Sequence, residues 1–189
     1  MNTNSFVGYF TPSLRAASAG LVLAVLTLLF GQGMGIVFGL NEDAIKSRLE
    51  ASASEVRDTA YKGDDAAIKA VLDKSWTYMH RAHLHAGGMG TTALSLIVLL
   101  CPLGTPRRVT AAISVGLGAG GFGYSIFWMW AGFRAPALGS TGAAKETLKW
   151  LAMPSSGAFV LSTIAVLVLL VATILSARLP GPEKDLESK

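Results

Sequence analysis

The chain has 189 residues, of which 51% are hydrophobic and only 15% are charged, with a formal net charge of +4. Soluble domains carry about a quarter charged residues, so this composition excludes an ordinary soluble protein. The basic residues form no run interleaved with aromatic side chains, so no nucleic-acid partner is expected. The single cysteine, Cys101, excludes an intramolecular disulfide.

Apolar segments determine the fold class. They lie at about residues 16–40, 79–101, 109–133 and 157–177, and about 20 mostly apolar residues are enough to span a lipid bilayer. The sequence therefore predicts an all-α, integral membrane four-helix bundle that forms a single domain over residues 1–189. The interiors of the spans contain no Asp, Glu, Lys or Arg, which disfavours an ion-coupled transporter.

The first and third spans carry glycines at helical spacing. Gly31, Gly35 and Gly39 recur every four residues, and Gly116 and Gly120 repeat the pattern in the third span. Small residues at this spacing let helix backbones approach closely, within the chain, against a partner membrane protein or in a homo-oligomer. The same smooth face also leaves room for a flat cofactor.

The segments outside the spans also have helical patterns. Asn41 begins a helical segment over 41–78, and Asp64 or Asp65 caps a run that continues to residue 101 without a break. In the outer loop at 135–156, Ser140 or Thr141 caps a short helix that Pro154 ends. We expect these segments to form a helical cap on the outer side of the membrane.

Orientation follows from the basic residues. Arg15, the pair Arg107 and Arg108, and Arg178 flank the spans on one side, whereas residues 41–79 hold six basic and eight acidic residues. Because cytoplasmic loops are enriched in lysine and arginine, both termini are predicted to be cytoplasmic, in the inner (plasma) membrane. The histidines then lie on the outer side.

All three histidines occur in the stretch WTYMHRAHLHAGGMG, residues 76–90. At about 100° per residue, His83 falls within the inward stripe of the helix and His80 lies at its edge, one turn away. His85 faces the other side. His80 and His83 can therefore share a ligand, whereas His83 and His85 contact different neighbours.

Haem ligation is the first hypothesis for this segment. His83 supplies one axial ligand, Arg81 and Trp76 line the mouth of the pocket, and His85 is a further imidazole within reach of a cofactor. Haem iron accepts His or Met as axial ligands. No other span contains a histidine, so the second ligand is a methionine, a residue of another subunit, or none. The candidate methionines are Met34, Met129 and Met153.

Two other hypotheses remain open. Copper or zinc is bound by His83 and His80, with Met79 or Glu146 as additional ligands, because imidazole suits both metals and thioether favours cuprous copper. Alternatively, the histidines are interfacial polar residues that hydrogen-bond to headgroups or to a partner. The sequence shows no nucleophile–base pair and no phosphate loop, so a non-catalytic subunit is favoured over an enzyme.

The stretch RAHLHAGGMG resembles the HAHLxxxG start of a helix in small four-helix membrane proteins related to subunit I of haem–copper oxidases. The segment SIFWMWAGFRAP is similar to their aromatic third span. The resemblance implies imidazoles at the outer surface, with His83 as haem ligand and Gly88 as the matched glycine. Arg81 stands where the family has its first histidine, and would pair with a propionate or a lipid phosphate.

The leading prediction is thus a haem b-binding electron-transfer subunit of a respiratory or photosynthetic membrane. The alternatives are a cofactor-free accessory or scaffold subunit of a larger membrane complex, and a copper- or zinc-binding membrane protein.

Overall fold

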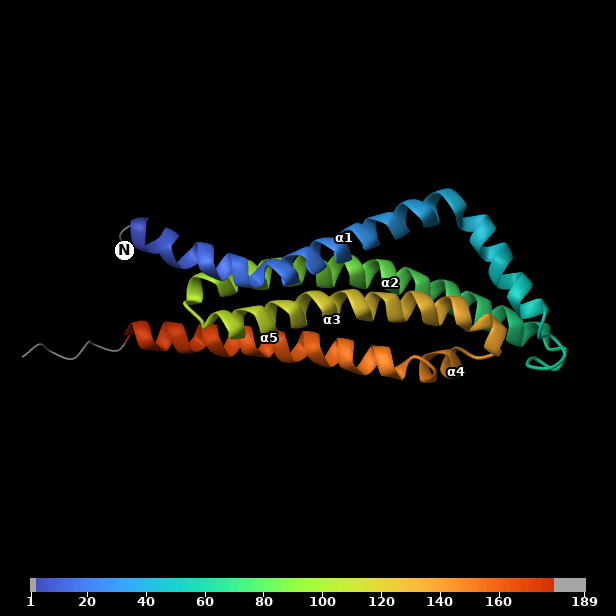
Figure 1. Cartoon of the computed structure of the whole chain (residues 1–189). Coiled ribbons are helices and arrows are strands. Elements are labelled where there is room, and N and C mark those ends of the chain that lie inside the picture. Colours follow the sequence, from blue (N-terminus) through green and yellow to red (C-terminus); the bar gives the residue numbers. More distant parts are fainter. Residues whose placement is uncertain (1–2, 179–189) are drawn as a thin grey trace, which may run out of the picture.

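The computed structural model describes residues 3–178, with side-chain environments for residues 11–177. Every regular element in this range is helical (Figure 1). The helices are α1 (Thr3–Ser54), α2 (Asp65–Leu100), α3 (Arg107–Arg134), α4 (Thr141–Glu146) and α5 (Lys149–Arg178). Two 3₁₀ turns, η1 (Cys101–Leu103) and η2 (Pro136–Leu138), adjoin the two ends of α3 along the chain.

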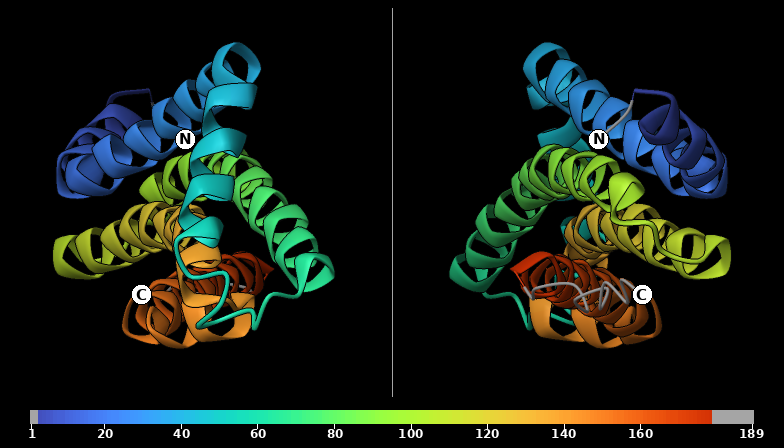
Figure 2. Two further views of the ribbon diagram at one scale, coloured as in Figure 1. Left: turned by 90° about the vertical axis from the view of Figure 1, so that its right-hand side faces the viewer. Right: turned by 90° about the vertical axis from the view of Figure 1, so that its left-hand side faces the viewer.

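Four helices, α1, α2, α3 and α5, are long and apolar enough to cross a membrane, as many as the sequence predicts. They alternate in direction, so that the start of α1 and the end of α5 lie at the same end of the bundle (Figure 1). Helix α3 packs against α1, α2 and α5, whereas α5 packs chiefly against α3 (Figure 2).

Helix α1 bends at Asn41, whose φ of −132° and ψ of 25° are not helical. The part before the bend diverges from α2, and the part after it crosses the far end of the bundle (Figures 1 and 2). We call residues 42–54 the arm. Leu49 and Ala53, 2% and 0% exposed, anchor the arm. A helix therefore follows Asn41, but it ends at Ser54, and a turn at 55–64 interrupts the segment predicted over 41–78.

Helix α2 begins where the sequence predicts. The Asp64 carboxylate accepts a hydrogen bond from the Ala67 N–H at 3.0 Å and so caps the helix. The helix then runs unbroken for 36 residues, as the continuous pattern over 65–101 predicts. It therefore connects the turn at 55–64 directly to the second apolar segment.

The predicted helix in the outer loop needs correction. Ser140 does cap α4, accepting a hydrogen bond from the Ala143 N–H at 3.2 Å, but α4 ends at Glu146. Pro154 does not end a helix, because α5 begins at Lys149 and contains it. A proline this near a helix start removes only one backbone hydrogen bond, and the apolar run beyond it continues the helix. The fourth apolar helix is thus longer than residues 157–177.

The glycines of α3 bring helix backbones together within the chain. A Cβ atom at Gly120 would lie 2.7 Å from the Ser155 carbonyl oxygen of α5, and one at Gly118 would lie 2.5 Å from the Gly20 carbonyl oxygen of α1. Neither distance is sterically possible. The close packing predicted for these residues is therefore found inside the bundle, where it fixes α3 between its neighbours.

Candidate functional site

His83 reaches from α2 to the surface of α1. Its ring fills the space beside Gly35, where a Cβ atom would lie only 2.9 Å from the His83 Cε1 atom. The Nδ1 atom lies 2.8 Å from the Gly31 carbonyl oxygen. A carbonyl only accepts hydrogen bonds, so Nδ1 carries the proton. In the neutral ring, the lone pair is then on Nε2.

His80 is held in the same way one turn earlier. Its Nδ1 atom lies 3.1 Å from the Trp76 carbonyl oxygen, which again assigns the proton to Nδ1. The ring packs against the indole of Trp76, with centroids 4.8 Å apart and planes at 84°, and against Phe38 at 5.9 Å. His80 is exposed, whereas His83 is half-buried. Two fixed imidazoles therefore follow each other along α2.

Both rings line one groove between α1 and α2, with a volume of about 230 Å³. The residues that line it are Gly35, Phe38, Gly39, Glu42, Trp76, His80 and His83. The Glu42 carboxylate belongs to the arm and accepts a hydrogen bond from the Lys46 ammonium group. In the part of the chain that the structure describes, no three His, Cys, Asp or Glu side chains gather closely enough to hold a metal.

His85 belongs to a different cluster, as the helical periodicity predicts. Its ring stacks on Tyr124 of α3, with centroids 5.1 Å apart and planes at 11°, and meets Trp128 edge-on at 6.0 Å. Arg81 is in this cluster too, since its guanidinium lies 5.1 Å from the Trp128 ring centroid and 5.6 Å from that of Tyr78. Arg81 therefore does not line the groove that holds His80 and His83.

The methionines lie outside the groove. Met34 is 6% exposed and packs in a core cluster with Met79, and Met129 joins this cluster from α3. Met79 faces α3, because a Cβ atom at Gly132 would lie 2.7 Å from its Cγ atom. Met153 is 68% exposed on α5. Among residues 11–177, the structure thus brings no methionine to the lining of the histidine groove.

Glu146 is also remote from the groove. It ends α4 and forms an ion pair with Lys149 at 2.6 Å. The carboxylate that the structure brings to the histidines instead is Glu42, which the sequence analysis missed. Glu42 follows Gly35, Phe38 and Gly39 at helical spacing, but α1 bends at Asn41, so this spacing alone does not indicate that Glu42 reaches the histidines.

The volume of the groove bears on which cofactor it accommodates. Pockets for small organic ligands usually have volumes of about 300–1,000 Å³, and the present groove, at about 230 Å³, is smaller. Its polar groups are imidazoles and one carboxylate, which are ligands for transition metals. The groove is therefore small for a porphyrin ring, and its polar groups are of the kinds that bind transition metals.

Comparison with known proteins gives no family to guide this assignment: no family model, no curated protein and no solved structure matches the chain.

Proposed function

We propose that the protein is a multi-pass membrane protein of the plasma membrane that binds a transition-metal ion on its outer side. Four apolar helices of sufficient length support the membrane assignment. Arg107 and Arg108 follow the turn between α2 and α3, at the end of the bundle where α1 starts and α5 finishes. The positive-inside rule assigns this end to the cytoplasm. The arm and α4 then form the outer cap.

The metal site consists of His80 and His83, with copper or zinc as the ion. One observation carries this proposal: backbone carbonyls hold both Nδ1 atoms, so both Nε2 lone pairs remain available at the same groove. Metal-binding histidines almost always donate their second ring N–H to a carbonyl, a carboxylate or water, which fixes the orientation of the ring. The two rings of α2 already have this arrangement.

Two protein ligands leave further coordination positions to water or to a side chain of a partner. A site of this kind binds its ion exchangeably, which suits a protein that receives or passes on a metal ion at the membrane surface. Glu42 lines the groove and places a negative charge beside the ion. Because histidine binds a metal ion only in its neutral form, the affinity for the metal falls as the pH is lowered.

Equilibrium dialysis of the detergent-purified full chain against Cu²⁺ or Zn²⁺, followed by elemental analysis, tests the proposal. We expect one bound ion per chain, and a decrease in affinity of about 10–100-fold in His83→Gln and in His80→Gln. His85→Gln is the matched control, because His85 is on the opposite side of the same helix. Equal binding by all three variants and the wild type, or no binding by the wild type, would contradict the proposal.

A b-type haem on His83 is the second candidate, because the free Nε2 atom of His83 also suits an axial ligand. The visible spectrum of the oxidised and dithionite-reduced protein distinguishes the two. The metal-ion proposal predicts no Soret band. A Soret band that disappears in His83→Gln would replace it with the haem assignment. A colourless protein that also binds no metal would support the cofactor-free scaffold.

A further inference from the structure

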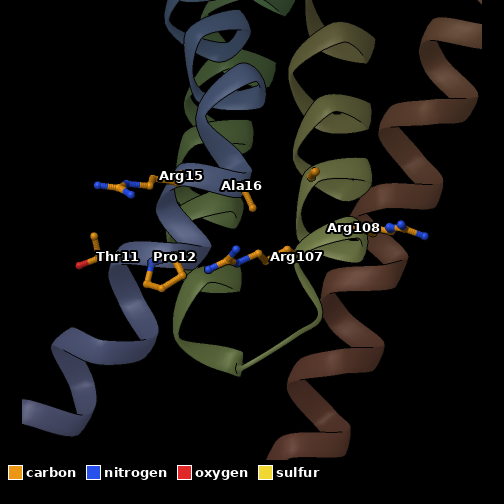
Figure 3. Close-up of a pocket in the computed structure, with 7 residues that line it drawn as sticks. Thr11, Pro12, Arg15, Ala16, Arg107 and Arg108 are labelled. Carbon is orange, nitrogen blue, oxygen red and sulfur yellow. The ribbon is translucent and has the colours of Figure 1, made fainter.

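A cationic pocket lies at the opposite end of the bundle from the histidines, between the first turns of α3 and the early part of α1 (Figure 3). Its volume is about 600 Å³, and its lining residues are Thr11, Pro12, Arg15, Ala16, Arg107, Arg108 and Ala111. Three of them are arginines and none is acidic. Within the described residues, none of the three arginines forms an ion pair with a carboxylate.

The arginines differ in direction. Arg107 extends from the start of α3 toward Pro12 of α1, whereas Arg15, one turn after Pro12, points from α1 away from α3 (Figure 3). Arg108 points to the other side. Arg107 is therefore the arginine that lies between the two helices, and Arg15 adds its positive charge from the outer side of α1. Guanidinium groups bind phosphate through paired, charge-assisted hydrogen bonds, which makes arginine well suited to this anion.

The start of α3 adds to the positive potential. A helix N-terminus carries a partial positive charge, and no side chain caps this one, because its N-cap residue is Pro106. Arg107 and Arg108 immediately follow it. Positive charges from the start of α3 and from α1 thus surround the pocket, and none of the residues that line it in the described part of the chain is acidic.

An apolar stripe leads away from the pocket along α1. Val22, Leu26 and Leu29 follow Arg15 at helical spacing on the same face, and they are 58%, 45% and 55% exposed. An occupant that matches both features has an anionic head for the arginines and a hydrocarbon chain for the stripe. Free phosphate satisfies only the first requirement.

We propose that this pocket binds the headgroup phosphate of an anionic phospholipid, with an acyl chain along the exposed stripe of α1. The predicted cytoplasmic location agrees with this occupant, because anionic lipids of the cytoplasmic leaflet bind basic pockets between membrane helices. The site is separate from the metal site, since the two lie at opposite ends of the bundle. Either proposal can fail without affecting the other.

Native mass spectrometry of the detergent-purified full chain tests the proposal, with phosphatidylglycerol and phosphatidylcholine added in equal amounts. We expect the wild type to retain phosphatidylglycerol preferentially. The double variant Arg15→Gln/Arg107→Gln should lose this preference by about 25-fold, because each arginine near lipid headgroups contributes about 1 kcal/mol. The matched control is Arg134→Gln, which removes an arginine from the opposite end of α3.

Three outcomes overturn the proposal: equal retention of the two lipids by the wild type, equal losses in the double variant and in Arg134→Gln, or complete displacement of the lipid by inorganic phosphate at millimolar concentration. The last result would identify a site for free phosphate instead. If the double variant does not fold, a salt titration of the wild type replaces it. Retention of phosphatidylglycerol must then decrease as the ionic strength rises.

Discussion

His83 occupies its position because Gly35 has no side chain. The ring lies where a Cβ atom would be, and the Gly31 carbonyl oxygen holds its Nδ1 atom. The glycine repeat of α1 and the histidine of α2 are therefore complementary parts of one contact. This contact joins the two helices and fixes the His83 ring, which lines the groove.

Gly35→Ala should consequently displace the His83 ring and weaken metal binding by about tenfold, since movement of a ligand by about 1 Å is enough to impair a preorganised site. Gly33→Ala is the matched control, because a Cβ atom at Gly33 meets nothing within 4 Å. The control should bind metal normally and unfold at the same or a higher temperature, since alanine favours the helix by up to about 1 kcal/mol. Equal metal affinities in the two variants would contradict this interpretation.

Tyr61 connects two segments of the chain that lie far apart in the sequence. Its side chain is buried, and its hydroxyl donates a hydrogen bond to the Pro136 carbonyl oxygen at 2.8 Å. This bond connects the turn after the arm to the loop after α3. Burial raises the pKa of the Tyr61 hydroxyl, because ionisation would leave a charge in an apolar environment.

Tyr61→Phe should reduce the free energy of unfolding by about 1 kcal/mol, the usual value for one hydrogen bond. Since the pKa is raised in the folded state, this contribution is fully present below the ordinary tyrosine pKa of about 10 and is lost at higher pH. Thermal unfolding of both proteins between pH 7 and pH 11 provides the test. The difference between them should decrease above about pH 10, and a difference that increases there would refute the assignment.

At the scale of elements, the central position of α3 depends on residues without side chains. Gly118 faces α1, whereas Gly116, Gly120 and Gly123 face α5. A Cβ atom at any of these positions would overlap with the neighbouring helix, so the helices approach more closely than larger residues permit. These glycine faces are occupied within the chain and are not available to a partner.

Gly120→Ala should therefore separate α3 from α5 and destabilise the bundle by about 1–3 kcal/mol, the usual cost of overpacking. Gly157→Ala, in α5, serves as the control, because a Cβ atom there meets nothing within 4 Å. Unfolding midpoints in detergent should be lower for the first variant and unchanged or higher for the second. Similar midpoints would show that the α3–α5 contact tolerates a methyl group.

At the scale of the whole molecule, the two ends of the bundle differ in chemistry. One end holds the histidine groove, the arm and α4, and the other holds the arginine pocket together with the start of α1 and the end of α5. The apolar length of the helices lies between them. This asymmetry matches a protein with a fixed orientation in a membrane.

Thr59→Cys should react with a membrane-impermeant maleimide in intact cells, because Thr59 is exposed in the turn between the arm and α2. The native Cys101 is buried and should not react, so the wild type is the control. A fluorescent protein fused to the C-terminus should fluoresce in the same cells, as expected on the cytoplasmic side. Labelling of Thr59→Cys only after lysis would reverse the proposed orientation.

Much of the fold was accessible from local sequence patterns. Apolar length predicted the four long helices, and the cap residues Asp64 and Ser140 were predicted at the starts of α2 and α4. Periodicity also placed His83 and His85 against different neighbours. The prediction that Pro154 ends a helix was wrong. Proline disfavours a helix locally, but the apolar run beyond Pro154 continues α5.

The sequence by itself determined the helices, their number and the faces on which the histidines lie, because these depend on composition and on a period of 3.6 residues. Only the tertiary structure showed which groups lie together: Glu42 lines one groove with His80 and His83, Arg81 contacts Trp128, and Arg15 and Arg107 line one pocket. The position of Glu42 depends on the bend at Asn41, and the helices approach one another at glycines. Such contacts join residues far apart in the chain, so no local pattern records them.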